Sequence, residues 1–309
     1  MNGPEAYWNG RFLPAVAAKV SPVDAGFVLG AAVAEQVRTF RGEPFCLERH
    51  VDRLLRSLAI AGIEPGMGRD AFVEVSRELV ARNRRLIDPA DDLGLAIFVT
   101  PGPYVQYGEP AETAPTVCLH TYPLPFQRWA DKYEQGQSLV VTEFQQVPPQ
   151  CWPAELKCRS RMHYYLADRR AAEREPGARA VLLDQRGLVT ETSTANVLMF
   201  RSDEGLVSVP HHTILHGISM AVVKELAEGL GVATSERALT PGDLARADEV
   251  LLTSTPFCVL PATRLDGRPI GDGRPGPLFR RLLAAWSERV GVDIAAQARR
   301  FAGRTAASL

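Results

Sequence analysis

The sequence predicts a two-domain protein of mixed α/β (α+β) class. Its 309 residues are enough for one large or two medium domains. Turn signals typical of β-hairpins mix irregularly with amphipathic helical patterns, which favours two layered domains over one doubly wound parallel sheet. A break at Pro123-Leu124-Pro125 separates the two halves. We therefore expect an N-terminal domain over 1–122, a connection over 123–133 and a larger C-terminal domain over 134–309.

Local patterns predict the elements of the first half. Asn9-Gly10 stands between two short apolar runs in Ala6–Leu13, which is a strong signal for a two-residue hairpin turn. Apolar residues at helical spacing predict a helix over Leu47–Gly62 that ends at its glycine. They predict a second helix over Asp70–Arg85, with Asp70 as its cap. We also expect strands at Val16–Val20, Leu93–Thr100 and Thr116–Tyr122.

The second half combines apolar, β-rich runs with a few helical stretches. Val147-Pro148-Pro149-Gln150 predicts a rigid turn, and Asp266-Gly267 predicts a hairpin. Helices are expected over Arg161–Arg174, 219–230 and Leu278–Val290, the last of these closing the fold; strands are expected over Ser138–Phe144, 178–184, 196–200, 206–209 and 249–254.

Composition excludes several classes of protein. A formal net charge of −1 provides no basic surface for nucleic acid or for an anionic membrane. No apolar run approaches the roughly 20 residues that span a bilayer, and the N-terminus lacks the pattern of a secretory signal. Five scattered cysteines without a C-x-x-C pair indicate reduced thiols. We expect a cytoplasmic protein without nucleic-acid or membrane partners.

The stretch Ala178–Phe200 places a glutamate in an unusual setting. An apolar run ends in a tight turn, and the next extended segment stops at Glu191, just before a hydroxyl-rich turn and another strand. A carboxylate held in a short turn between two buried strands needs a partner, because desolvating it alone is costly. Lys157, 34 residues earlier, is a candidate for Schiff-base chemistry if its site is partly dry. Either residue by itself is more commonly a surface charge.

Three further positions could bind an anion, and each has an ordinary structural alternative. Arg53 lies among the apolar residues of the first helix, where it could fork onto a phosphate or snorkel at the surface. His216-Gly217-Ile218-Ser219 precedes a helix, so it is either an anion site or a plain capped start. Ser254 and Thr255 end an apolar strand, where hydroxyls either bind ligands or form a turn.

Histidines His211, His212 and His216 lie close together in the sequence, but their spacing fits no standard ligand set. The sequence therefore predicts no metal site.

Five motifs in order resemble the class IV aminotransferases: HVDRL, LKCRSRM, TETSTANVL, LHGIS and DEVLLTSTP. These fold-type IV pyridoxal-phosphate enzymes include branched-chain and D-amino-acid aminotransferases and aminodeoxychorismate lyase. The resemblance extends from about Tyr7 to Gly276, which is nearly the whole chain. It implies a small N-terminal α/β domain and a larger, β-rich α/β domain that binds the cofactor. It also implies a homodimer whose site lies between the two domains and is completed by the partner chain.

The resemblance assigns roles to individual residues. Lys157 would hold pyridoxal 5'-phosphate as a Schiff base and then move the substrate proton. Glu191 would hydrogen-bond the pyridine nitrogen, so that the ring accepts electrons. Asn196 would support the turn near this glutamate. The phosphate cup would consist of Arg53, the amides of Ile218 and Ser219, and Thr255, with Gly217 and Ser254 as further cofactor-binding residues.

Departures from the family pattern leave the substrate open. Met162 stands where branched-chain enzymes have a tyrosine on the ring hydroxyl, and the loop 101–107 lacks the arginine and histidine of D-amino-acid enzymes. Ala34 replaces the bulky residue that normally precedes the glutamate of the first-domain strand.

Extra polar groups near the lysine suggest how substrate could be held. We hypothesise that Arg159 or Arg161 binds a substrate carboxylate and that Tyr164 replaces the missing ring-hydroxyl partner. Tyr104 and Pro256 complete the candidate substrate residues.

The leading interpretation is an aminotransferase that moves an amino group between an amino acid, branched-chain-like or other, and a 2-oxo acid by a ping-pong mechanism. The alternative is aminodeoxychorismate lyase, in which the same lysine would eliminate pyruvate and yield 4-aminobenzoate. A catalytically idle protein that binds pyridoxal phosphate is a third possibility.

Overall fold

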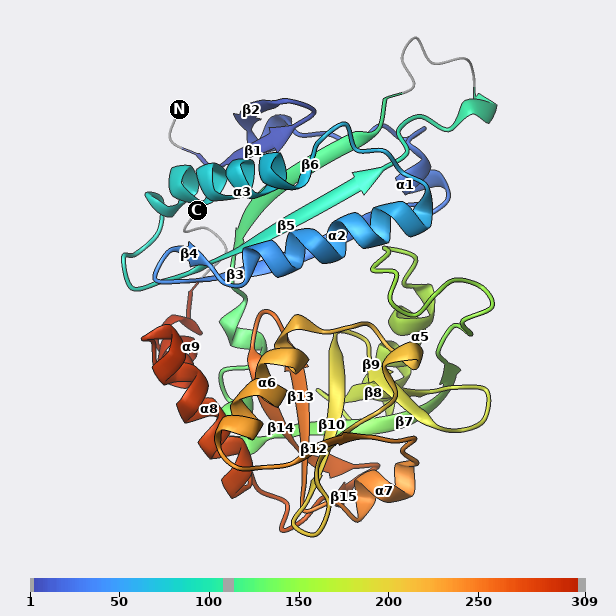
Figure 1. The fold of residues 1–309 in the computed structure, drawn as a ribbon, viewed down its shortest axis with the longest axis vertical. Coiled ribbons are helices and arrows are strands. Elements are labelled where there is room, and N and C mark those ends of the chain that lie inside the picture. The colour runs from blue at the N-terminus through green and yellow to red at the C-terminus, as the bar shows by residue number, and fades with distance from the viewer. Residues whose placement is uncertain (1–2, 108–113, 305–309) are drawn as a thin grey trace. The chain divides into compact units, whose positions relative to one another are not determined.

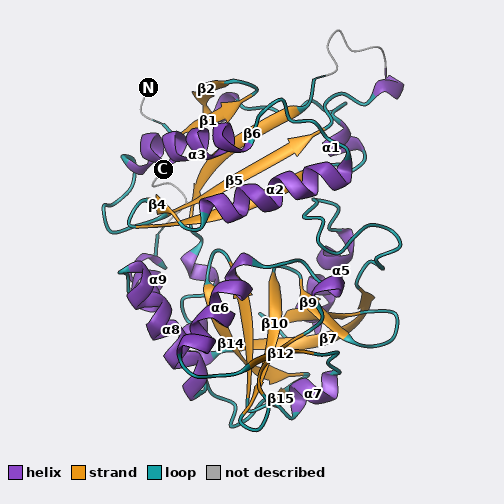
Figure 2. Cartoon of the chain, viewed as in Figure 1, coloured by secondary structure: helices purple, strands orange, loops and turns teal. Residues whose placement is uncertain are grey.

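A computed structural model describes residues 3–107 and 114–304 of the chain (Figure 1). The chain forms two compact units: a first one of Met1–Leu124, Leu156–Ser160 and Arg304–Leu309, and a second one of Pro125–Glu155 and Arg161–Gly303. Both units contain helices and strands (Figure 2), as the predicted mixed α/β class requires. These units are defined by compactness alone, so the predicted domains over 1–122 and 134–309, with the connection over 123–133, stay a prediction. No helix of the described residues is long and apolar enough to cross a membrane.

The first unit contains a six-stranded antiparallel sheet in the order β2-β1-β6-β5-β3-β4. Helices α2 and α3 cover one face of this sheet (Figure 1), where apolar side chains such as Leu54, Phe72 and Ile97 form a buried core. The elements are β1 Glu5–Trp8, β2 Arg11–Pro14, α1 Ala25–Val28, β3 Val33–Phe40, β4 Glu43–Pro44, α2 Leu47–Ala61, α3 Arg69–Arg84, β5 Leu93–Thr100 and β6 Thr116–Pro123.

Local signals explain much of this unit. The hairpin at Asn9-Gly10 is confirmed, and both residues have the positive φ angles, 44° and 92°, that such a turn requires. Helix α2 ends where expected, at Gly62, whose φ is 66°. Two predictions are wrong. Gly68, not Asp70, precedes α3, and Asp70 lies inside the first turn.

Val16–Val20 is the second wrong prediction, because it forms no strand and begins with the short 3-10 helix η1 (Ala15–Ala17). The segment follows β2, the edge strand of the sheet, but pairs with none of the described strands, and Val16 is 86% exposed, so its apolar side chain is not buried as a strand residue.

The second unit contains a nine-stranded sheet that closes on itself in part. Strand β9 pairs with β8 on one side and with β10 on the other, so β9, β10, β13, β14, β7 and β8 form a closed ring of pairings. The strands are β7 Gln137–Gln145, β8 Arg179–Leu183, β9 Val189–Thr192, β10 Ala195–Arg201, β11 Gly205–Ser208, β12 Thr234–Glu236, β13 Glu249–Ser254, β14 Cys258–Leu265 and β15 Arg268–Pro269.

Helices of the second unit pack around this sheet. Helix α5 packs on β7 and β8 through Tyr164, Ala167 and Ala171, and α6 packs on β13 and β14. The predicted chain end is wrong, because α9 follows α8. The helices are α4 Lys132–Gln135, α5 Met162–Arg174, α6 Ile218–Gly229, α7 Pro241–Ala245, α8 Pro277–Val290 and α9 Ile294–Phe301, with the 3-10 turns η3 Phe126–Arg128 and η4 His211–Thr213.

Candidate active site

Glu191 lies at the point where the sheet of the second unit closes. It belongs to β9 and stands directly opposite Asn196 of β10, across the turn at Ser193-Thr194. Only 8% of the Glu191 surface is exposed. The expectation that the carboxylate lies in the turn is therefore wrong: Glu191 lies inside β9, and the turn begins two residues later, at Ser193.

Neutral side chains donate hydrogen bonds to this buried carboxylate. The Tyr164 hydroxyl donates to Glu191 Oε1 at 2.7 Å, and Gln146 Nε2 donates to the same oxygen at 3.0 Å. Asn196 Nδ2 donates to Oε2 at 3.2 Å. Such donors satisfy a buried anion without adding an opposite charge. Gln146 was missed by sequence reasoning, because it precedes Glu191 by 45 residues and carries no motif.

The start of α6 approaches the same part of the unit. Asn196 Nδ2 also donates to the Leu215 carbonyl at 2.9 Å, and Gly217 is the residue that precedes the helix. A Cβ atom at Gly217 would lie 1.9 Å from Asn196 Oδ1, so only glycine allows this approach. The first amides of α6, at Ile218 and Ser219, have no partner inside the helix and can bind an anion.

The end of β13 adds hydroxyl groups. Thr253 pairs with Asn196 across the strands, so their side chains lie on the same face of the sheet as Glu191. Among the described residues, the buried Thr253 hydroxyl has no hydrogen-bond partner. Ser254 instead donates its hydroxyl to the Thr194 carbonyl at 2.6 Å. Thr255 and Pro256 follow in a half-buried turn.

Lys157 belongs to the first unit, in a segment that runs beside β3. Its carbonyl accepts a hydrogen bond from the Ala34 amide at 2.9 Å, and its amide donates to Ser57 Oγ at 3.2 Å. The Arg159 amide donates to the Ala32 carbonyl at 2.8 Å. The backbone on both sides of the half-buried lysine is therefore fixed to the sheet and to α2.

Arg53 is 5% exposed, so the alternative of a snorkelling surface arginine is wrong. Its Nε and Nη2 donate to the two carboxylate oxygens of Glu35 at 2.8 and 2.7 Å. His50 Nδ1 lies 3.1 Å from Glu35 Oε1. Burial alone would raise the pKa of Glu35, but Arg53 and His50 hold it well below its ordinary value. Glu35 is thus an ionised carboxylate that fixes the orientation of Arg53.

The candidate substrate residues belong to both units. Arg161 and Tyr164 lie together in the second unit, with the Arg161 guanidinium 4.4 Å from the centre of the tyrosine ring. Arg159 is exposed on the first unit. The Tyr104 amide of the same unit donates to the Val23 carbonyl at 2.8 Å. The Tyr164 hydroxyl binds Glu191, which is a contact that the sequence did not suggest.

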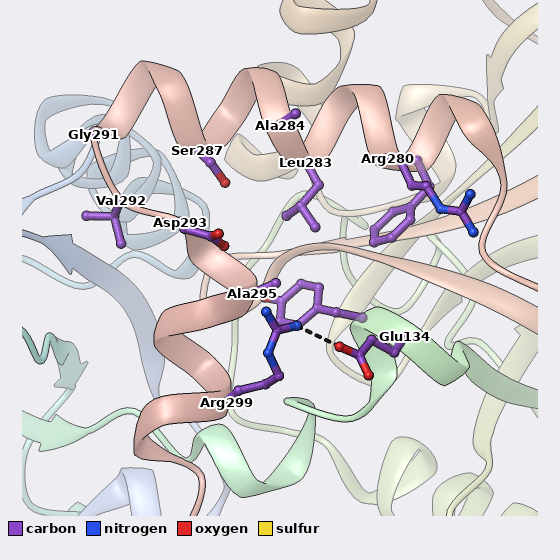
Figure 3. A pocket seen from close by; sticks show the side chains of 12 residues that line it. Glu134, Arg280, Leu283, Ala284, Ser287, Gly291, Val292, Asp293, Ala295 and Arg299 are labelled. Atoms are coloured by element: carbon purple, nitrogen blue, oxygen red, sulfur yellow. Dashed lines mark hydrogen bonds and ion pairs between the residues drawn. The ribbon is translucent and has the colours of Figure 1, made fainter.

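A cavity of about 570 Å³ in the second unit lies elsewhere (Figure 3). Helices α8 and α9 line it with residues such as Leu283, Ala284 and Ala295, and Arg299 forms an ion pair with Glu134 at 2.8 Å beside it. None of the predicted site residues lines this cavity.

Known proteins that resemble this chain are named as aminotransferases. The family model of amino-transferase class IV matches residues 32–265. The D-alanine aminotransferase of Bacillus licheniformis is 31% identical over 282 residues, which cover 90% of this chain and 94% of that protein. The D-alanine aminotransferase of Staphylococcus aureus strain N315 is 30% identical over 288 residues, which cover 92% of this chain and 97% of that protein.

Solved structures of branched-chain amino acid aminotransferases are similar to this chain. The T.th. enzyme complexed with N-(5'-phosphopyridoxyl)-L-glutamate has a TM-score of 0.81 at 25% identity, covering 94% of this chain and 95% of its own. The Escherichia coli enzyme has a TM-score of 0.85 at 23% identity, covering 93% of this chain and 94% of its own, and this second likeness concerns the fold alone.

Proposed function

The chain belongs to the amino-transferase class IV family, and from this membership we propose that it binds pyridoxal 5'-phosphate through Lys157 and Glu191. Class IV aminotransferases are pyridoxal-phosphate enzymes, and this protein is an aminotransferase that acts on amino acids and 2-oxo acids. The relatives named above are aminotransferases, so aminodeoxychorismate lyase is not favoured.

The residues of the second unit suit such a cofactor. Glu191 is a buried carboxylate with neutral donors, which suits a cationic ring nitrogen. The start of α6 and the hydroxyls that end β13 are groups that bind a phosphate. The observation that carries the proposal is the placement of Glu191, Asn196 and Thr253 in one row beside the start of α6. The partnerless Thr253 hydroxyl supports a polar ligand there.

The proposed site residues would have separate roles in cofactor binding and catalysis. When bound, pyridoxal 5'-phosphate supplies an aldehyde that an amine can attack and a ring that stabilises negative charge at the substrate α-carbon. Lys157 would hold the cofactor through Nζ, with loss of water from the aldehyde, and would move a proton to and from the substrate α-carbon. Glu191 would accept a hydrogen bond from the ring nitrogen and so keep a proton there. Arg53, oriented by Glu35, would contribute one cation to phosphate binding, and the amides of Ile218 and Ser219, with the Thr255 hydroxyl, would contribute neutral donors. The Ser254 hydroxyl already donates to the Thr194 carbonyl, so Ser254 would lie beside the phosphate without donating that proton to it.

Chemical trapping of the lysine tests this proposal. Reduction of the cofactor-loaded protein with borohydride, followed by peptide mass spectrometry, is expected to find the pyridoxyl group on the peptide that contains Lys157. Lys224, which is partly exposed and forms an ion pair with Glu236, is the internal control. Label on other lysines in equal amount, or none on Lys157, would refute the assignment.

The substrate preference is tested with D- and L-amino acids as amino donors. D-alanine, L-leucine and L-glutamate are each mixed with the loaded protein without a 2-oxo acid, and conversion of the cofactor to its amine form is followed by absorption. A true aminotransferase completes this half-reaction and is restored by a 2-oxo acid. Pyruvate release from aminodeoxychorismate without any 2-oxo acid would favour the lyase instead.

The proposal includes a cytoplasmic homodimer. Apolar side chains of the first unit are exposed on neighbouring segments: Val23 by 39%, Phe27 by 73%, Leu29 by 56% and Val105 by 64%. Such a patch suits a subunit interface. Light scattering is expected to give twice the mass of the chain, and Phe27→Glu is expected to weaken the dimer. A wild-type monomer at micromolar concentration would refute this part.

A further inference from the structure

Gln146, Tyr164 and Glu191 form a closed triangle of hydrogen bonds. Gln146 Nε2 donates to the Tyr164 hydroxyl oxygen at 2.6 Å and to Glu191 Oε1 at 3.0 Å, while the tyrosine donates to the same carboxylate oxygen at 2.7 Å. Two donors therefore converge on Oε1, whereas the bond from Asn196 to Oε2 is longer, at 3.2 Å.

The orientation of the Gln146 amide is fixed by its surroundings. Its Oε1 accepts a hydrogen bond from the Val147 backbone amide at 3.0 Å and lies 2.9 Å from His163 Nε2. A backbone amide can only donate, so the side-chain oxygen of Gln146 must face it. Nε2 must then face Tyr164 and Glu191.

Tyr164 is held as a permanent donor. Its ring is 9% exposed and packs in the core between α5 and the sheet, with the His163 ring centre 4.0 Å away. Burial and the neighbouring Glu191 charge raise the pKa of Tyr164 well above 10. The phenol therefore keeps its proton over the whole working range of pH.

Hydrogen bonds to a carboxylate stabilise its charge and lower its affinity for a proton. We propose that Tyr164 and Gln146 tune Glu191, so that a proton shared with the cofactor ring stays on the ring nitrogen and not on the carboxylate. Tyr164 is then a positioning residue of Glu191 and not a partner of the ring hydroxyl. This inference rests on the proposed role of Glu191.

The consequence for the reaction concerns the ring as an electron acceptor. A ring nitrogen that keeps its proton stabilises charge at the substrate α-carbon better than a neutral one. Removal of the Tyr164 hydroxyl makes Glu191 more basic and moves the proton towards it. The rate at which the proton is removed from the substrate α-carbon falls. The affinity for substrate, which does not involve the Tyr164 hydroxyl, stays the same.

The test is nitrogen NMR of cofactor labelled at the ring nitrogen, bound to wild type, Tyr164→Phe and Tyr165→Phe. Tyr165 is the adjacent tyrosine on α5 and is 64% exposed, so the same substitution there is a matched control. In Tyr164→Phe the resonance is expected to move towards that of neutral pyridine, with kcat about tenfold lower and KM unchanged. Tyr165→Phe is expected to match wild type in all three.

Gln146→Glu is the second variant, because it places another carboxylate 3.0 Å from Glu191 and is expected to shift the resonance in the same direction. An unchanged resonance in both variants, with the cofactor bound, overturns the tuning role and leaves the proposed function intact. A wild-type protein that does not hold the cofactor at Lys157 overturns the proposed function itself.

Discussion

Replacement of Glu35 by glutamine tests the buried ion pair that orients Arg53. Glu35 is fully buried and accepts four hydrogen bonds or close polar contacts: two from Arg53, one from His50 and one from the Gln36 amide at 2.8 Å. Glu35→Gln keeps the size of the side chain but removes its charge. It also turns one acceptor oxygen into an NH2 group that faces other donors.

The expected cost follows from burial. Removing one partner of a buried ion pair leaves an uncompensated charge and typically destabilises a protein by about 3–5 kcal/mol. The control is Glu48→Gln on the same helix as Arg53. Glu48 accepts from Arg77 at 2.6 Å, but these side chains are 44% and 57% exposed, so that pair is worth less than about 1 kcal/mol.

Urea unfolding of the cofactor-free variants, followed by circular dichroism and tryptophan fluorescence, measures the difference. We expect Glu35→Gln to lower the free energy of unfolding by at least about 2 kcal/mol more than Glu48→Gln. Equal losses in the two variants would refute the reasoning. Hydrogen exchange of β3 and α2 locates the loss in the first unit.

Three further predictions follow from single contacts. Gly217→Ala forces a Cβ atom into Asn196 Oδ1, so it should cost about 1–3 kcal/mol and weaken cofactor binding. Gly229→Ala, at the last residue of the helix that Gly217 precedes, meets open space and should cost nothing in urea titrations; equal effects would contradict the close approach. Thr253→Val replaces a partnerless hydroxyl, so unfolding of the cofactor-free protein should be unchanged or up to about 1 kcal/mol more costly, while the Kd for pyridoxal 5'-phosphate should rise; a less stable variant would contradict this. Burial lowers the pKa of His50 from 6.5, so the unfolded chain binds more protons below that pH, and the free energy of unfolding should fall as pH drops from about 7 to about 5. His50→Gln should flatten part of that slope, and an identical slope would contradict the assignment.

The sequence predicted those elements of the fold that depend on neighbouring residues. The Asn9-Gly10 hairpin and the end of α2 at Gly62 need only local turn chemistry, and both are confirmed. A strand needs a partner that the sequence does not display, which explains the error at Val16–Val20. Strand β14 was missed, because Pro261 in its middle argues against a strand.

The candidate site shows the same division. Glu191 and Asn196 are five residues apart, and a hairpin brings them opposite each other, as a local reading suggests. Gln146 and Tyr164 reach Glu191 from distant segments, and Glu35 reaches Arg53 from another element. Such contacts depend on tertiary packing, so no motif in a single sequence indicates them. The alternative of a surface position for Arg53 was wrong, because the sequence does not show that Glu35 is its buried partner.

The central claim is that an amine at Lys157 and a carboxylate at Glu191 serve one cofactor molecule. A crystal structure of the protein loaded with pyridoxal 5'-phosphate measures this most directly. We expect continuous density from Lys157 Nζ to the cofactor and Glu191 within hydrogen-bond distance of the ring nitrogen, about 2.7–3.2 Å. A cofactor attached to another lysine, or a ring nitrogen that faces a residue other than Glu191, would contradict the account.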